Sequence, residues 1–314
     1  MLIAAAVVLL ALFGHCSRAQ APEPGAREWP GDAPYSVPIE VLDETLDCAA
    51  GSTSPDGTGR SEPVLLVHGT AVTREQNWGW GYWPALKAAG FEVCWVQLPD
   101  QATGDIQLSA EYVARAVELM AARSGEKVDI LGHSQGGLSP RWAIKFFPSG
   151  ALVDDYVGLA SPNHGSAAAD RRIDRGSACP AACWQMRTES DFIAALNAGD
   201  ETPGGISYTN IFTTNDELVI PYSSSRLTGA NNVLLQDVCR GRPIDHFLIA
   251  GDSVTWQLTL DALTHDGGAD PDRLRGFTCL KLALPGATMD WPDDPSTATA
   301  TPVNAEPRLK PYAR

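Results

Sequence analysis

The residues best suited to chemistry lie in one short segment, Gly132-His133-Ser134-Gln135-Gly136. A predicted strand over 128–131 precedes this segment and a predicted helix follows it. A serine flanked in this way by two glycines, on a strand-to-helix turn, is typical of an exposed nucleophile, since side chains at the glycine positions would crowd the neighbouring elements. The helix N-terminus also favours developing negative charge. We therefore predict Ser134 as a nucleophile rather than part of a plain glycine-rich turn.

A serine nucleophile needs a histidine base that an acidic side chain holds in place. On this kind of turn the chain order is serine, then acid, then histidine. His164 follows the serine too early to leave room for the acid. His265 ends an amphipathic helix, where a surface histidine is the simpler interpretation. His246 follows the last predicted strand in a loop, and we predict it as the base.

The acid is expected at the carboxyl end of a late strand. Asp216 follows the predicted strand 206–213 directly and is our choice. Glu217 is its nearest rival. Asp245 is weaker, because an acid next to the histidine in sequence normally points away from it.

Attack on an ester creates an oxyanion, which backbone N–H groups must stabilise. The backbone amide of Gln135, next to the nucleophile, is one expected donor. The loop after the first buried strand, His68-Gly69-Thr70, is expected to supply the other, with Thr70 adding its hydroxyl. An ordinary turn is the alternative interpretation of that loop.

The elements that must position these groups alternate between short apolar runs and amphipathic segments. Strands are predicted over 64–67, 91–96, 127–131, 156–160, 206–213 and 233–238. Helices are predicted over 78–89, 106–123, 137–147 and 254–263. This alternation is typical of an α/β fold with a mostly parallel central sheet and helices on both faces.

Composition narrows the classes of function. The 314 residues are 44% hydrophobic and 19% charged, which fits a globular protein. The formal net charge of −15 argues against nucleic acid as a partner, because such proteins present a basic surface. We expect a monomer.

The two ends of the chain differ in composition from its middle. Residues 2–14 form a 13-residue apolar run, too short to span a bilayer but suited to a signal peptide, which we place at 1–19. We expect export, with no transmembrane anchor. A Pro- and Gly-rich tether over 20–40 and an extended tail over 281–314 are expected to flank one domain, 41–280.

The cysteines fit an exported protein. Cys16 leaves with the signal, and an even number in an extracellular chain implies disulfides. The six that remain are Cys48, Cys94, Cys179, Cys183, Cys239 and Cys279. Their number alone allows 15 pairings. The sequence has no CxxC pair and no HExxH motif, so we expect no metal site, and the proposed chemistry needs no cofactor.

Several ordered segments resemble the α/β-hydrolases of the Candida antarctica lipase B type. The likeness runs from about Val41 to Leu280 and recurs near the C-terminus. The matching segments are 66–70, 134–138, 146–149, 215–219, 244–246, 306–307 and 311–314.

This resemblance implies the α/β-hydrolase fold and a secreted triacylglycerol lipase or carboxylesterase. It implies Ser134, Asp216 and His246 as catalytic triad, with Thr70 and Gln135 at the oxyanion hole. It also implies disulfides, pairing Cys48 with Cys94 and Cys239 with Cys279 and leaving Cys179 to Cys183.

Substrate preference is less well defined. The family's Thr-Trp before the nucleophile is replaced by Gly132-His133, and its long C-terminal helix by the short tail 284–304, which leaves the pocket wider. A neutral acylglycerol ester at a lipid–water interface is our first expectation. A polyester or wax-ester hydrolase with the same triad, and an inactive surface-binding module, are the alternatives. Residues 166–196 could form a lid, stiffened by the local disulfide.

Overall fold

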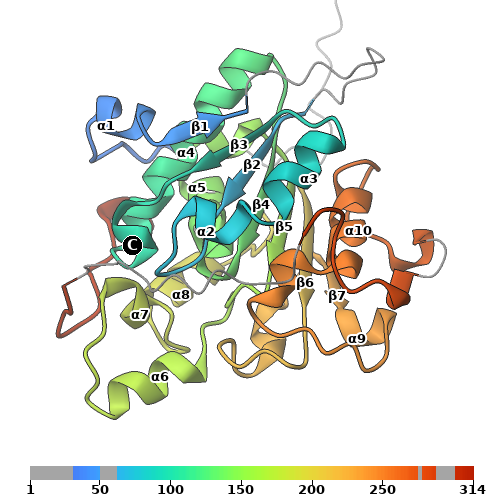
Figure 1. Ribbon diagram of the computed structural model, residues 1–314. Helices are drawn as coiled ribbons and strands as arrows, with labels where there is room; N and C mark the ends of the chain where they lie inside the picture. Colours follow the sequence, from blue (N-terminus) through green and yellow to red (C-terminus); the bar gives the residue numbers. More distant parts are fainter. Residues whose placement is uncertain (1–30, 50–61, 275–277, 288–300) are drawn as a thin grey trace, which may run out of the picture.

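The computed structural model describes residues 31–49, 62–274, 278–287 and 301–314 (Figure 1). Its centre is a seven-stranded sheet with the order β1-β3-β2-β4-β5-β6-β7. The strands are β1 Leu46–Cys48, β2 Val64–Val67, β3 Val93–Val96, β4 Val128–His133, β5 Val153–Leu159, β6 Ser207–Phe212 and β7 Asn231–Leu234. β1 pairs antiparallel with β3, and the other neighbours pair in parallel. The predicted α/β class is therefore confirmed.

Helices cover both faces of this sheet. They are α1 Ile39–Asp43, α2 Arg74–Trp78, α3 Tyr82–Ala88, α4 Ile106–Ser124, α5 Leu138–Phe146, α6 Ala167–Asp174, α7 Ala181–Gln185, α8 Asp191–Asn197, α9 Leu235–Val238 and α10 Ser253–Ala262. Figure 1 shows α2, α3 and α10 on one side of the sheet and α4 and α5 on the other. Among the described residues, no helix is long and apolar enough to cross a membrane.

The strands are apolar on both faces because both faces are covered. In β2, Leu65 and Val67 join the core beneath α4 and α5, whereas Val64 and Leu66 join the core beneath α2, α3 and α10. All four side chains are fully buried. A parallel sheet between two helical layers requires such a continuous apolar run.

The predicted helix over 78–89 is wrong in its extent. The structure has α2 and α3 in its place, separated by the turn Gly79-Trp80-Gly81. Gly81 has φ −141° and ψ −93°, outside the helical region, so one continuous helix cannot form. Two glycines within three residues make such a break inexpensive.

The last predicted strand, 233–238, is also only partly correct. Strand β7 ends at Leu234, and residues 235–238 form the single helical turn α9. Leu235 remains fully buried in this turn. Burial of alternate apolar residues fits a short strand and a helical turn equally well, so periodicity alone could not separate them.

The segment expected as an N-terminal tether packs closely where the structure describes it. Ala33 N donates to Phe146 O at 3.0 Å, and the backbone N–H groups of Ser36 and Val37 donate to the Glu111 carboxylate at 2.6 and 2.8 Å. These contacts fix residues 31–37 against α4 and α5, unlike a free tether. The predicted signal segment, 1–19, lies outside the described residues.

The described C-terminal segment, 301–314, is extended and firmly held. The Glu306 carboxylate accepts from the backbone N–H groups of Asp191 and Phe192 at 3.0 and 2.8 Å, which caps α8. Gln107 on α4 donates to Arg308 O at 3.1 Å and accepts from Lys310 N at 2.7 Å. The tail thus ties two helices together.

Three disulfides cross-link the described chain, two between distant segments and one within a short loop. They join Cys48 to Cys94, Cys179 to Cys183 and Cys239 to Cys279. The first links the edge strand β1 to β3, the second closes the loop that leads into α7, and the third holds residues 278–287 to the end of α9.

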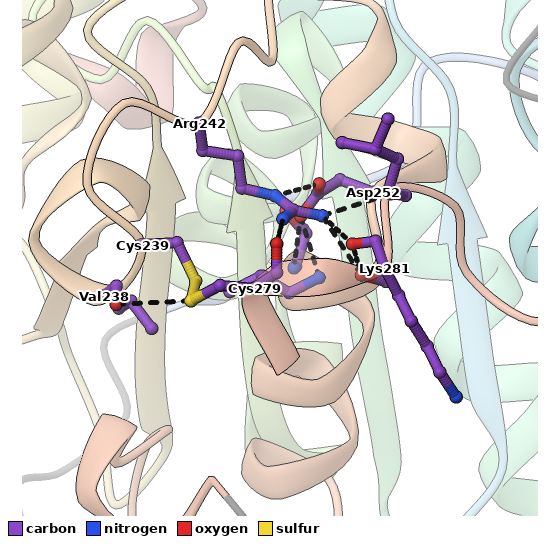
Figure 2. The surroundings of a disulfide bond; sticks show 10 residues. Val238, Cys239, Arg242, Asp252, Cys279 and Lys281 are labelled. Atoms are coloured by element: carbon purple, nitrogen blue, oxygen red, sulfur yellow. Dashed lines mark hydrogen bonds and ion pairs between the residues drawn. A yellow bond between two sulfur atoms is a disulfide. The ribbon is translucent and has the colours of Figure 1, made fainter. Parts of the chain in front are cut away.

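A buried ion pair lies beside the third disulfide (Figure 2). Arg242 Nε donates to Asp252 Oδ1 at 2.5 Å, and both side chains are at most 2% exposed. Arg242 also donates to the carbonyl oxygens of Cys279, Lys281 and Leu282 at 3.2, 2.6 and 3.1 Å. One guanidinium therefore connects residues 279–282 to the N-terminus of α10.

The same aspartate caps α10. Asp252 Oδ2 accepts from the N–H groups of Val254 and Thr255 at 2.9 and 2.8 Å. Removing Arg242 would leave this carboxylate buried with only neutral donors, which is costly.

We expect Arg242→Gln to lower the free energy of unfolding by about 3–5 kcal/mol, the usual cost of breaking a buried pair from one side. Lys127→Gln is the control, because it removes the exposed pair between Lys127 and Asp154 and should cost about 1 kcal/mol or less. Urea unfolding of both variants measures the difference. Equal losses of unfolding free energy in the two variants would contradict the stabilising role assigned to the pair between Arg242 and Asp252.

Candidate active site

Ser134 lies on a sharp turn between β4 and α5. Its φ is +57°, in the left-handed region that residues with a side chain seldom adopt. A Cβ at position 132 would lie 2.1 Å from Gly136 O, and one at position 136 would lie 2.3 Å from Val67 O. Both positions therefore require glycine, and the strained turn presents the Ser134 hydroxyl above the sheet.

A chain of two hydrogen bonds joins three side chains from separate loops. Ser134 Oγ lies 2.9 Å from His246 Nε2, and His246 Nδ1 lies 2.9 Å from Asp216 Oδ2. His246 and Asp216 side chains are 2% and 1% exposed. Serine, histidine and aspartate in this order can pass a proton from the hydroxyl to the imidazole and stabilise the resulting cation.

Two further bonds orient the Asp216 carboxylate. Its Oδ1 accepts from the N–H groups of Leu218 and Val219 at 2.9 and 2.7 Å, which leaves Oδ2 for the imidazole. The two rival acids are used differently. Glu217 accepts from the backbone N–H of His246 at 3.3 Å, and Asp245 accepts from Phe247 and Leu248 N–H groups in its own turn.

The loop that carries His246 is tied to the end of β6. Thr213 Oγ1 donates to Ile244 O at 2.6 Å, and Asn215 Nδ2 donates to Arg242 O at 3.0 Å. Gln236 Nε2 donates to both Thr213 Oγ1 and Arg242 O, at 2.8 and 3.0 Å. Acid and base are thereby held in one rigid unit.

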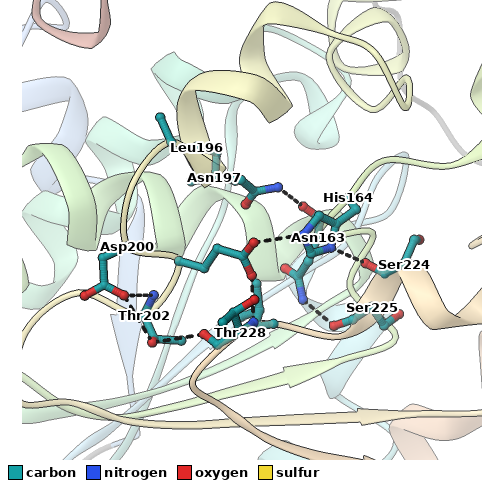
Figure 3. Close-up of polar contacts among 12 residues, drawn as sticks. Asn163, His164, Leu196, Asn197, Asp200, Thr202, Ser224, Ser225 and Thr228 are labelled. Carbon is teal, nitrogen blue, oxygen red and sulfur yellow. Dashed lines mark hydrogen bonds and ion pairs between the residues drawn. The ribbon is translucent and has the colours of Figure 1, made fainter.

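The other late histidines lie elsewhere. His164 sits in the polar cluster of Figure 3, where Nε2 lies 3.1 Å from a Glu201 oxygen and Nδ1 lies 3.3 Å from Ser224 O. Neighbouring Asn163 donates to Ser225 O at 2.6 Å and to Asn210 Oδ1 at 3.0 Å. This cluster fastens the loop after β5 to the segment after β6. His265 contacts Asp261 at the end of α10.

The predicted oxyanion loop approaches Ser134 closely. A Cβ on Gly69 would lie 3.2 Å from the Ser134 Cβ, so the glycine permits this approach. Thr70 Oγ1 donates to Gln135 Oε1 at 2.5 Å, which connects the loop to the residue after the serine. The sequence-predicted residues Ser134, Gln135, Thr70, His246 and Asp216 thus come together around one point.

Two buried side chains, for which no role was predicted from the sequence, fix this loop. His68 Nδ1 donates to Gly69 O at 2.8 Å while its Nε2 accepts from Leu98 N at 2.9 Å. Asn77 Oδ1 accepts from Gly69 N at 2.9 Å. Both backbone polar groups of Gly69 are therefore held by side chains. His68 is the first residue of the predicted loop, so the sequence indicated its position, but Asn77 gives no such signal.

Burial keeps two histidines near the site uncharged. Burial lowers the pKa of His68 to about 4. Burial, together with the nearby His246, lowers the pKa of His133 to about 3. His133 Nε2 donates to His246 O at 2.9 Å. A neutral His133 can thus support the backbone of His246 without adding a second positive charge beside it.

A cavity of about 780 Å³ opens above Ser134. Apolar lining residues include Val72, Met186, Leu218, Val219 and Phe247. Residues 168–186, from α6 to α7, form part of the wall, so the predicted lid segment does border the site. Apolar walls around one reactive hydroxyl suit an acyl chain.

A separate group of carboxylates lies near the amino ends of β4 and β5. Oxygen atoms of Asp129, Asp154 and Asp155 lie within 4.8 Å of one another. Burial raises the pKa of Asp129 to about 9 and that of Asp155 to about 7. Asp129 is therefore protonated at neutral pH, which reduces the repulsion among these carboxylates.

Comparison with known proteins finds similar sequences. Residues 61–240 match the family described as lipase (class 2). Lipase B of Pseudozyma antarctica is 30% identical over 302 residues, which cover 90% of this chain and 87% of that protein. Pseudozyma antarctica is the same organism as the Candida antarctica named in the sequence analysis. A triacylglycerol lipase of Pseudarthrobacter phenanthrenivorans is 31% identical over 114 residues, or 34% of this chain and 35% of its own. The resemblance inferred from the motifs is confirmed.

Solved structures give the same result. Aspergillus fumigatus lipase B superposes with a TM-score of 0.78 at 29% identity, covering 93% of this chain and 77% of that one. Bacillus licheniformis lipase BlEst2 in its mature form superposes with a TM-score of 0.59 at 18% identity, covering 70% and 98%. The second likeness concerns the fold alone.

The buried neutral histidines predict a pH dependence of stability. Below the unfolded pKa of 6.5 the unfolded chain binds protons that His68 and His133 do not bind until about pH 4 and 3. Stability should therefore fall as the pH falls below about 6.5, by up to about 1.4 kcal/mol per pH unit for each histidine.

We expect His68→Gln to weaken this dependence in urea unfolding measured between about pH 7 and 4. His265→Gln is the control, because the His265 side chain is 53% exposed. An unchanged slope in His68→Gln would contradict the assignment of a buried neutral imidazole.

Proposed function

We propose that this chain, which belongs to the class 2 lipase family and is a carboxylic-ester hydrolase, works through an acyl-enzyme on Ser134. His246 accepts the hydroxyl proton while Ser134 Oγ attacks the ester carbonyl carbon. Asp216 stabilises the imidazolium that forms. The observation that carries the proposal is the pair of 2.9 Å contacts linking serine, histidine and aspartate beneath an apolar cavity.

The oxyanion formed by this attack needs donors that are already in place. We assign that role to the backbone N–H groups of Gln135 and Thr70 and to the Thr70 hydroxyl. The hydroxyl donates to Gln135 Oε1 in the resting structure and must rotate toward the oxyanion. The fixed geometry of Gly69 supports this assignment, because it removes the freedom of the loop.

The rest of the cycle uses the same base. The imidazolium of His246 gives its proton to the departing alcohol as the ester C–O bond breaks. A water molecule then loses a proton to the imidazole and attacks the acyl carbon. The imidazolium returns this proton to Ser134 Oγ as the acyl C–O bond to Ser134 breaks, which releases the carboxylic acid and restores the free serine. No cofactor enters these steps.

Neutral acylglycerols are the substrates we favour. Relatives named lipase B and triacylglycerol lipase support this choice, as does the apolar lining. Secretion is the location we propose, because all six cysteines of the described residues are paired in disulfides, which persist in oxidising compartments. We further propose a monomer that touches the lipid–water interface with the mouth of its cavity.

Substitutions in the triad test this mechanism. Ser134→Ala and His246→Ala should each lower kcat by roughly 10⁶, and the double variant should lose little more, because the groups act as a unit. Release of p-nitrophenol from a short-chain ester measures this. More than a few per cent of the wild-type rate in Ser134→Ala, free of wild-type enzyme, would refute the role of that serine.

A matched pair of variants tests the acid. Asp216→Asn should lose orders of magnitude in kcat, whereas Glu217→Gln should be mild, because only Asp216 contacts the imidazole ring. The reverse ranking would move the acid by one residue.

The structure also predicts how freely substrate reaches Ser134. The Cys179 to Cys183 disulfide closes a short loop in the cavity wall and should limit movement of the wall. Tributyrin hydrolysis should therefore rise smoothly through the solubility limit. A jump of about tenfold or more at saturation would mean a lid that opens on the lipid surface.

The substrate class is tested separately. Erosion of a polyester film by the enzyme, with poor hydrolysis of triolein, would favour the polyester alternative.

A further inference from the structure

The cavity carries a charge opposite to that of the whole chain. The chain has a formal net charge of −15, yet three arginines line the cavity, Arg171, Arg172 and Arg175. Among the described residues, the lining contains no aspartate or glutamate. An acidic protein that gathers three guanidinium groups at its reactive cavity creates a local positive potential, which attracts anions.

All three arginines belong to α6 or to the residue that follows it. No residue of α6 is buried, so packing of the core does not require these side chains. Arg171 and Arg175 are four residues apart and thus share one face of the helix. The helix is anchored through Asp170, which accepts from Arg187 at 3.0 Å and from Thr188 at 2.7 Å.

The positive charges are not neutralised internally. Within the described part of the chain, Arg171 and Arg175 form no ion pair. Arg172 donates to a neutral acceptor, Ala178 O, at 3.3 and 3.4 Å, which holds its guanidinium against the cavity wall. The nearby acids are accounted for. Asp170 is engaged as described, and Asp216 is committed to His246. Asp174 is exposed, and among the described residues it forms no ion pair with the three arginines.

We infer that the cavity recognises esters that carry an anionic group several atoms from the ester bond, with Arg171, Arg172 and Arg175 as the recognition site. The inference rests on the proposed function, because it places the ester carbonyl at Ser134. The apolar lining then accommodates the chain between the ester and the anion. A guanidinium pairs with a carboxylate or phosphate through paired hydrogen bonds, and does so more strongly beside a low-dielectric wall.

A pair of dissolved substrates tests this directly. The mono-p-nitrophenyl ester of adipic acid and p-nitrophenyl hexanoate have acyl chains of equal length and differ in one terminal carboxylate. We expect wild-type kcat/KM for the adipate ester to exceed that for the hexanoate by about tenfold, mainly through a lower KM. Raising NaCl from about 50 to 500 mM should narrow this ratio, because salt screens the arginines.

Substitutions of arginine test whether these side chains cause the preference for the adipate ester. Arg171→Gln combined with Arg175→Gln should bring the ratio close to one, and this double variant keeps the bond from Arg172 to Ala178 intact. Arg240→Gln is the matched control, because Arg240 is exposed and lies outside the cavity lining. Its ratio should equal that of the wild type.

Three outcomes would overturn the inference: a wild-type ratio at or below one, an unchanged ratio in the double variant, or an effect of the variant only on binding to vesicles of anionic phospholipid. The last would make α6 a surface-docking helix. Failure of the wild type on both esters would instead refute the proposed function.

Discussion

The strained backbone of Ser134 is the constraint on which the site depends. A positive φ at a residue with a side chain persists only where the surroundings fix it. Here the parallel strands β2 and β4 and the start of α5 meet so closely that residues 132 and 136 have no space for a Cβ. This close packing around Gly132 and Gly136 keeps the strained turn, and with it Ser134, in place.

The parallel sheet converts this local feature into a site. Carboxyl ends of parallel strands meet at one edge, so the loops after β2, β4 and β6 bring Thr70, Ser134 and Asp216 together. His246 follows β7 and α9, and its loop is bound to β6 through Thr213 and beyond it to α10 through Arg242. The ion pair of Figure 2 is thus a remote support of the base.

Much of this was predictable from the sequence because it depends on local patterns. The strand Val64–Val67 and the helix that begins at Ile106 follow from apolar runs and spacing, and the elbow follows from its two glycines. What failed depended on context. The break at Gly79-Trp80-Gly81 needed backbone angles, and α9 needed knowledge of its neighbours. Asn77 could not be found, because its contact with Gly69 exists only after folding.

The central claim is that Ser134, activated by His246, becomes covalently acylated. Stoichiometric inactivation with a p-nitrophenyl alkylphosphonate, followed by peptide mass spectrometry, tests it most directly. The account predicts one adduct per chain, on Ser134, with activity lost in proportion to labelling and little labelling in His246→Ala. An adduct on another residue, or full activity in chains labelled at Ser134, would contradict it.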